Sequence, residues 1–209
     1  NRFVYHLSLI NMTMLIIVSG PDRVGKSTLI ESMVQELSTG DTFVAHHGPP
    51  PDYNENIFDM YRETICDWKE SGKEFAIFDR AYPCSYILEQ HRRHNAGHFE
   101  DIIDLEIETA AAVDSVVHIG VFRPWHWSAP FHLEEIRAKT PGAALWYIRD
   151  QYISRMQEHE IYTQQLLNFY ENITMFPNHQ IHNLDANGRA ALANCRAVLG
   201  KFNAIPDAS

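Results

Sequence analysis

Cysteine is scarce in this chain. Its 209 residues include three cysteines, Cys66, Cys84 and Cys195, and no two of them form a C-x-x-C pair. An odd and scattered set excludes a disulfide framework and a zinc knuckle, and it is typical of a protein in the reducing cytosol. We therefore expect a cytoplasmic protein whose thiols act as small apolar side chains.

Basic residues are also few. The chain has 17 Lys and Arg against 27 Asp and Glu, which gives a formal net charge of −10 at pH 7. Proteins that grip a nucleic-acid backbone usually carry a net basic balance or a long basic stripe. The basic residues here are scattered, so we expect small-molecule substrates and no large nucleic-acid footprint.

Long hydrophobic runs are missing as well. The stretch between Arg2 and Asp22 contains no Lys, Arg, Asp or Glu, but polar residues interrupt it and its last part leads into a loop motif as a buried strand. We expect no membrane segment. The length predicts a single domain over residues 14–209, with residues 1–13 as an N-terminal extension.

Short apolar runs alternate with helical patterns along the chain, which indicates an α/β domain. The runs predict five strands, at residues 14–19, 42–46, 74–78, 115–122 and 180–184. The helical patterns lie at residues 26–37, 54–71, 86–93, 98–113, 146–171 and 186–202. Residues 123–145 are rich in aromatic and turn residues and are expected to be irregular. Strands separated by helices predict a three-layer fold, with a five-stranded parallel sheet, helices on both faces, and ligands at the carboxyl ends of the strands.

A phosphate-binding loop motif follows the first strand. Residues 20–27 read Gly-Pro-Asp-Arg-Val-Gly-Lys-Ser, which fits G-x-x-x-x-G-K-[ST] at every position. The glycines let backbone N–H groups approach phosphate oxygens, and the next helix starts at its positive end. Lys26 can reach the β- and γ-phosphates of ATP, and the Ser27 hydroxyl can ligate Mg²⁺. The expected ATP-binding residues are Gly20, Val24, Gly25, Lys26, Ser27 and Thr28.

An acidic residue ends the third strand. Residues 75–80 read Phe-Ala-Ile-Phe-Asp-Arg, and an apolar strand that ends in an acid is the Walker-B arrangement, whose carboxylate organises Mg²⁺ or its waters. Arg80 follows directly, and a guanidinium there can bind a phosphate through two hydrogen bonds. We expect Asp79 at the metal and both Asp79 and Arg80 in catalysis.

These segments resemble thymidylate kinases and their phage-type relatives. That family carries a G-x-D-x-x-G-K-[ST] loop and a D-R-[YH] segment with a serine close behind, which correspond here to residues 20–27, Asp79-Arg80 and Ser85-Tyr86. The resemblance implies a P-loop kinase fold with a lid at about residues 124–145. It also implies ATP as the donor and a deoxynucleoside monophosphate, dTMP or a similar pyrimidine nucleotide, as the acceptor.

The resemblance also implies roles for single residues. Asp22 would accept a hydrogen bond from the 3′-hydroxyl of the acceptor sugar, and Arg23 would neutralise the transferring phosphoryl group. Arg80 would hold the acceptor phosphate, and Asp79 would assist Mg²⁺. The remaining substrate contacts would come from Arg62, Ser85 and Tyr86.

Departures from the family leave the acceptor open. The family's Glu-Pro after the second strand is replaced by His46-His-Gly-Pro-Pro-Pro51, and Ala81 stands where Tyr or His is usual. A nucleoside kinase acting on a 5′-hydroxyl would use a base, typically a carboxylate after the second strand. A nucleotide-binding switch without transferase activity would also keep the loop.

The helix over 146–171 is expected to face mostly the core, with a homodimer contact as the alternative.

Overall fold

In the computed structural model of the chain, the described residues are 13–37, 42–47, 57–92 and 99–182. The expected helix at 186–202 and nearly all of the expected N-terminal extension lie outside these residues.

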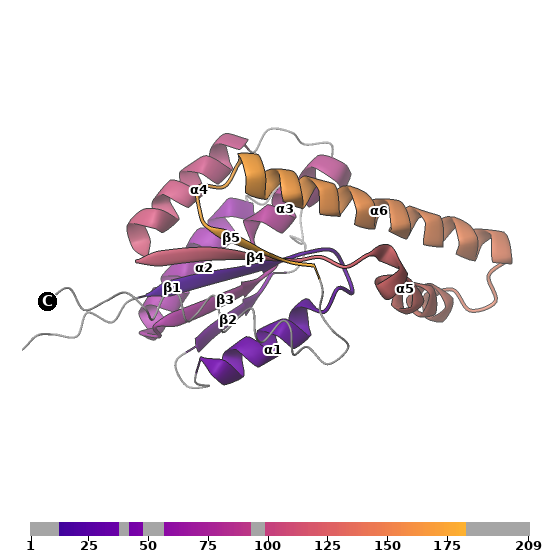
Figure 1. Ribbon diagram of the computed structural model, residues 1–209, viewed down its shortest axis with the longest axis horizontal. Coiled ribbons are helices and arrows are strands. Elements are labelled where there is room, and N and C mark those ends of the chain that lie inside the picture. The colour runs from indigo at the N-terminus through magenta and orange to yellow at the C-terminus, as the bar shows by residue number, and fades with distance from the viewer. Residues whose placement is uncertain (1–12, 38–41, 48–56, 93–98, 183–209) are drawn as a thin grey trace, which may run out of the picture.

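A five-stranded parallel sheet forms the centre of the molecule, as the sequence predicts (Figure 1). Its order is β2-β3-β1-β4-β5, and each neighbouring pair is parallel. The strands are β1 (Met14–Ser19), β2 (Thr42–His46), β3 (Phe75–Asp79), β4 (Ser115–Val121) and β5 (Asn178–Ile181). All six residues of β1 are buried, as a strand with covered faces on both sides requires.

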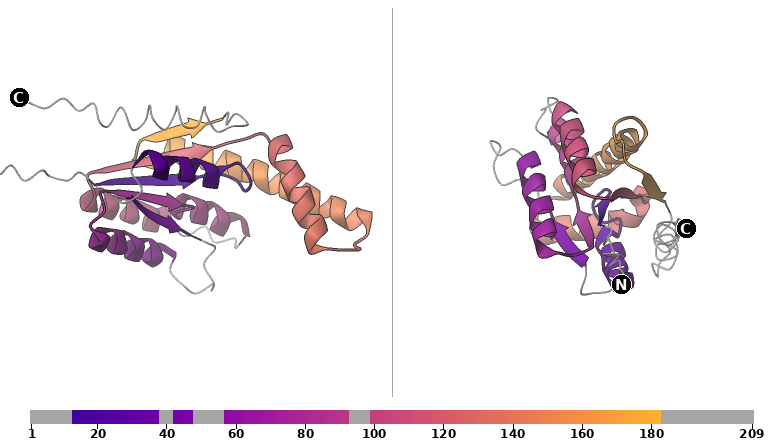
Figure 2. Two further views of the ribbon diagram at one scale, coloured as in Figure 1. Left: turned by 90° about the horizontal axis from the view of Figure 1, so that it is seen from below. Right: turned by 90° about the vertical axis from the view of Figure 1, so that its left-hand side faces the viewer.

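Helices cover both faces of the sheet (Figure 2). One face carries α2 (Ile57–Ser71), α3 (Tyr82–Arg92), α4 (Phe99–Ala112) and α6 (Leu145–Asn172), and the other carries α1 (Lys26–Glu36). Leu15 and Ile17 of β1 lie in the first core, while Ile16 and Val18 lie in the second with α1. Because alternate side chains of a strand point to opposite faces, this one strand serves both cores.

The segment after β4 corrects the sequence prediction, because it is helical and not irregular. It forms α5 (Trp125–Lys139), with Pro130 inside the helix. Its buried residues share one face but are partly polar, so the sequence shows no apolar stripe there; they are Ser128, Ala129, His132 and Ile136. α5 packs against α6, and the two form a hairpin that extends past the carboxyl ends of the strands (Figure 1).

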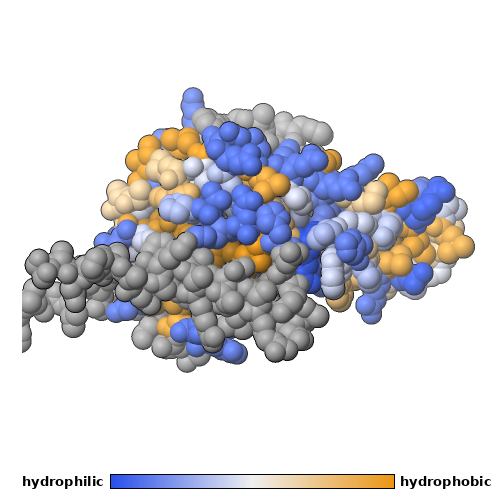
Figure 3. Space-filling view, in the orientation of Figure 1, coloured by the Kyte–Doolittle hydropathy of each residue, from blue (hydrophilic) through white to orange (hydrophobic). Residues whose placement is uncertain are grey.

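Large apolar side chains are exposed on the α5–α6 hairpin. Figure 3 shows hydrophobic side chains among hydrophilic ones on this projecting part. The exposed apolar residues of the two helices are Trp127, Phe131, Leu145, Trp146, Tyr147 and Ile153. The homodimer contact stays a prediction. None of the described helices combines the length and the apolar character that a membrane crossing needs.

A buried carboxylate ties α4 to two other segments. Glu106 is fully buried and accepts hydrogen bonds from the Tyr82 hydroxyl at 2.9 Å, the Thr174 hydroxyl at 2.6 Å and the Met175 amide at 2.7 Å. Burial acts to raise the pKa of Glu106, but hydrogen bonds, that of His118 foremost, outweigh it and lower the pKa. The group is therefore charged at neutral pH and fully enclosed by donors.

Replacing Glu106 with Gln should lower the free energy of unfolding by about 2 kcal/mol. Gln has nearly the same size as Glu, but its neutral amide is a weaker acceptor for the surrounding donors than the charged carboxylate. Urea denaturation at neutral pH measures this loss. Glu108→Gln is the matched control, since that carboxylate is exposed on the same helix and pairs with Arg62; it should cost less than about 1 kcal/mol. Equal losses in both variants would contradict a special role for Glu106.

Candidate active site

The turn between β1 and α1 is shaped to surround an anion. Gly20 lies so close to β4 that an added Cβ would be 2.3 Å from the Val121 carbonyl oxygen. Gly25 has a φ of 97°, a left-handed conformation that glycine adopts freely, directly before the first turn of α1. The backbone N–H groups of that turn are then free to donate to a phosphate.

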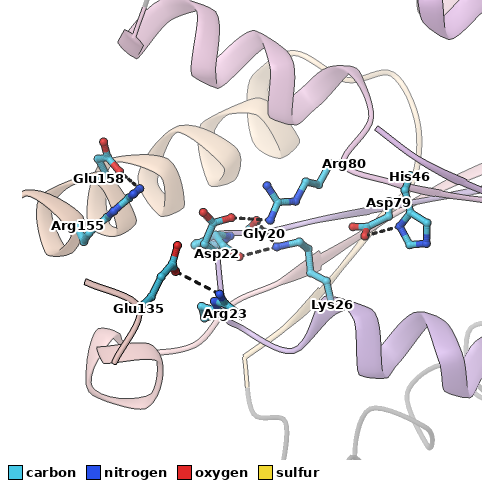
Figure 4. A network of polar contacts seen from close by, with 11 residues as sticks. Gly20, Asp22, Arg23, Lys26, His46, Asp79, Arg80, Glu135, Arg155 and Glu158 are labelled. Atoms are coloured by element: carbon cyan, nitrogen blue, oxygen red, sulfur yellow. Dashed lines mark hydrogen bonds and ion pairs between the residues drawn. The ribbon is translucent and has the colours of Figure 1, made fainter. Parts of the chain in front are cut away.

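Lys26 lies inside this loop. Its Nζ donates to the carbonyl oxygens of Gly20 at 2.9 Å and Pro21 at 2.6 Å, and the residue is 5% exposed (Figure 4). Burial lowers the pKa of Lys26, and the nearby Arg80 acts in the same direction. The ammonium is thus held by neutral carbonyl groups, so a phosphate would supply the negative charge that it lacks.

Arg80 reaches the loop from the end of β3. Its guanidinium lies 2.6 Å from the Asp22 carboxylate, 58 positions away in the sequence (Figure 4). Burial acts to raise the pKa of Asp22, but Arg80, followed by Lys26, outweighs it and lowers the pKa. Arg80 has a φ of 60°, a conformation that costs an ordinary residue about 1–3 kcal/mol and that recurs at functional sites.

Arg23, within the loop itself, also has a strained backbone conformation. Among the described residues other than glycine, only Arg23 and Arg80 have a positive φ, and that of Arg23 is 63°. Its guanidinium lies 3.2 Å from the carboxylate of Glu135 on α5, and Lys139 lies 2.6 Å from the other oxygen of that carboxylate. The phosphate loop is therefore joined to the hairpin by an ion pair.

Asp79 is buried at the end of β3, next to the loop. Its Oδ2 lies 3.0 Å from Nδ1 of His46, while its Oδ1 is buried and has no hydrogen-bond partner among the residues that the structure describes. A buried carboxylate oxygen left without a partner is costly, and Mg²⁺ or its water would satisfy it.

The unpartnered Asp79 oxygen fits a magnesium ion, and Ser27 stays a predicted ligand. Ser27 is exposed at the start of α1. Within the described part of the chain, no three His, Cys, Asp or Glu side chains form a metal-binding group. Mg²⁺ at phosphate sites is usually held by one or two side chains together with the phosphates.

The other residues expected at the site are not all brought to the loop. Ser85 is buried and its hydroxyl lies 2.5 Å from that of Tyr61, while the ring of Tyr86 packs 6.3 Å from that of Phe169. Val24 is buried in the core beside α1, and Thr28 is exposed.

Arg62 is held by carboxylates of α2 and α4. It donates to Glu108 at 2.6 Å and to Asp59 at 2.8 Å, and these bonds, that to Glu108 foremost, raise its pKa. Arg62 would have to leave these carboxylates to reach a nucleotide.

Sequence reasoning missed two residues of α5 at the loop. Glu135 pairs with Arg23, and His132 interacts electrostatically with Asp22. Both lie in the segment predicted to be irregular. Residues three positions apart share a face only in a helix, so the sequence prediction did not place these two side chains together.

Four histidines with lowered pKa values make the folded state sensitive to acid. Burial lowers the pKa of His47 to about 4 and also lowers the pKa values of His118, His132 and His159. Below about pH 6.5 the unfolded chain then binds more protons than the folded protein.

The free energy of unfolding should therefore fall as the pH drops from about 6.5 toward 4, by at most about 1.4 kcal/mol per pH unit for each histidine. Urea denaturation at several pH values measures the slope, and His47→Gln should reduce it. A slope of zero over this window would contradict neutral, buried histidines.

Comparison with known proteins supports the fold. No family model matches the chain, and no curated protein is similar to it in sequence. Polyphosphate kinase 2 from Arthrobacter aurescens TC1 is similar in structure, with a TM-score of 0.66 and 12% identity over 94% of this chain and 70% of that chain. A putative polyphosphate kinase 2 from Pseudomonas aeruginosa PA01 has a TM-score of 0.66 and 15% identity over 93% of this chain and 43% of that longer chain. At these identities the likeness concerns the fold alone, and the chain shares the α/β fold of these two structures.

Proposed function

We propose that this protein is a kinase that transfers a phosphoryl group from ATP, with Mg²⁺, to an acceptor that already carries a phosphate. The observation that carries the proposal is the position of Arg80 beside Asp22 and over the loop that holds Lys26. A switch that only binds a nucleotide has no need of a second strained cation from another strand at this place.

Each group at the loop has a part in such a transfer. The loop amides and Lys26 bind the donor phosphates, and Arg80 orients the acceptor phosphate. Ser27 and Asp79 would hold Mg²⁺, which would supply positive charge beside the phosphates. Arg23 stabilises the charge that spreads over the transferring group. An acceptor phosphate is already an anion, so no general base is required.

A nucleoside acceptor is less well supported, because its 5′-hydroxyl profits from a base. His46 is the last residue of β2 and His47 follows it, while Asp52 lies outside the described residues. His46 is engaged with Asp79, and the pKa of His47 is lowered to about 4 by burial. A base with so low a pKa accepts a proton poorly at neutral pH.

The finer proposal is that the acceptor is a deoxynucleoside monophosphate, dTMP or a similar pyrimidine nucleotide. It is supported by the resemblance of residues 20–27, Asp79-Arg80 and Ser85-Tyr86 to thymidylate kinases. Asp22 repels the phosphates that its loop attracts. Its presence is understandable if it both pairs with Arg80 and accepts a hydrogen bond from the sugar 3′-hydroxyl.

A 3′-deoxy analogue of the acceptor should bind more weakly by about 1–3 kcal/mol, the value of a hydrogen bond to a charged group. Competition against the natural acceptor at saturating ATP measures the difference. Equal binding of both compounds would show that Asp22 acts only as the counter-ion of Arg80.

Polyphosphate is the second candidate for the phosphorylated partner. Both similar structures are named polyphosphate kinase 2. In this chain, basic side chains continue from the loop along the hairpin, where Arg23 and Lys139 share Glu135. On α6, Arg155 pairs with Glu158 at 3.1 Å (Figure 4). A long polyanion could bind several of them at once.

Transfer from γ-labelled ATP to a panel of acceptors tests the function. The panel contains deoxy- and ribonucleoside monophosphates, nucleosides and short polyphosphate, and Lys26→Ala serves as the control protein. Labelled diphosphate is the expected product, with dTMP among the best acceptors. Label on polyphosphate would favour the second candidate, label on nucleosides would overturn the phosphorylated acceptor, and no transfer to any compound would overturn the kinase.

A further inference from the structure

Among the described residues, Glu135 is the only one whose carboxylate contacts Arg23. Its Oε2 lies 3.2 Å from the Arg23 guanidinium (Figure 4). Its Oε1 lies 2.6 Å from Nζ of Lys139, one turn further along α5. One carboxylate thus joins a cation of the phosphate loop to a cation of the hairpin.

The surroundings hold Glu135 in this position and keep it charged. Hydrogen bonds from Lys139 and then Arg23 lower the pKa of Glu135, so it is ionised at neutral pH. One turn earlier on α5, His132 is close enough to Asp22 for Asp22 to act on its pKa, in the direction that raises it. The direct contact between α5 and the phosphate loop is the Arg23–Glu135 ion pair.

This contact competes with a bound triphosphate for Arg23. The guanidinium that neutralises a γ-phosphate must direct its N–H groups at phosphate oxygens, while the structure directs those of Nη2 at Glu135. Glu135 and Lys139 also line a cavity of about 180 Å³ between α5 and α6. Glu135 has room there to keep Lys139 after Arg23 has left.

We propose that Glu135 is a positioning residue that holds Arg23 against α5 in the nucleotide-free protein and releases it to the γ-phosphate of the donor. This rests on the proposed function, because it requires a triphosphate in the loop. The contact acts on triphosphates and not on diphosphates, since only the γ-phosphate replaces the carboxylate.

Calorimetric binding of a non-hydrolysable ATP analogue and of ADP, both with Mg²⁺, tests the proposal. Glu135→Gln should tighten binding of the ATP analogue by about two- to fivefold, the value of a partly exposed ion pair, and leave ADP binding unchanged. Glu134→Gln is the matched control, because it removes the same charge from the preceding residue of α5, which is exposed. It should leave both affinities unchanged.

A double-mutant cycle separates release of Arg23 from a general effect of charge. In the Arg23→Gly background, Glu135→Gln should no longer change binding of the ATP analogue. A persistent gain there, or equal effects of Glu134→Gln and Glu135→Gln, would overturn the role of Glu135 while the kinase proposal stands. Failure of the wild-type protein to bind the ATP analogue would overturn both proposals.

Discussion

Replacing Lys26 with Ala should lower the kcat of phosphoryl transfer by about 10³-fold and leave the fold intact. The ammonium lies among loop carbonyls, where the charge of the β- and γ-phosphates has to be neutralised. It takes no part in either hydrophobic core, so its removal should not unfold the protein. Steady-state kinetics with the best acceptor, together with thermal melting, measure the two effects.

Lys69→Ala is the control for this variant, because Lys69 is exposed in the last turn of α2. It should retain full activity. Equal activity of Lys26→Ala and the wild-type protein would contradict the assignment of the phosphate loop, whatever the behaviour of the control.

Replacing Arg23 with Gly should lower kcat by about 10²–10³-fold with a small change in the KM for the nucleotide. A guanidinium at the transferring group can contribute on the order of 10³ in kcat, and an interaction made mainly in the transition state appears in kcat. Glycine adopts the left-handed φ of 63° at this position without strain, so the loop should keep its shape.

The competing source of this charge is the hairpin. Arg137 is exposed on α5, and Lys139 is held by Glu135; either would have to be brought to the donor by closure of the hairpin. Arg137→Ala and Lys139→Ala should each lower kcat by less than about tenfold. If they prove more damaging than Arg23→Gly, the catalytic cation comes from the hairpin.

The sequence predicts the sheet and the long helices well, because their signals are local. The apolar runs of β1 and β3 and the pattern of α6 lie within one or two residues of the observed bounds. α5 escaped prediction because its buried face contains serine and histidine and the helix includes Pro130. α3 begins at Tyr82, earlier than predicted; Pro83 in its first turn was the available signal.

The candidate site was predictable only where one motif carries it. The loop from Gly20 to Ser27 is continuous in sequence, so its shape follows from its own glycines. The pairs Asp22–Arg80 and Arg23–Glu135 join residues 58 and 112 positions apart. The hydrophobic periodicity of the sequence does not predict such contacts, because they depend on the strand order and on the position of α5.

Counting ADP molecules released per protein chain tests the kinase most directly. With ATP, Mg²⁺ and a saturating phosphorylated acceptor, we expect many equivalents of ADP per chain, matched one to one by phosphorylated product and dependent on the acceptor. Release that stops at a single equivalent, or that proceeds equally without an acceptor, would contradict phosphoryl transfer and indicate a nucleotide-binding switch or a simple hydrolase.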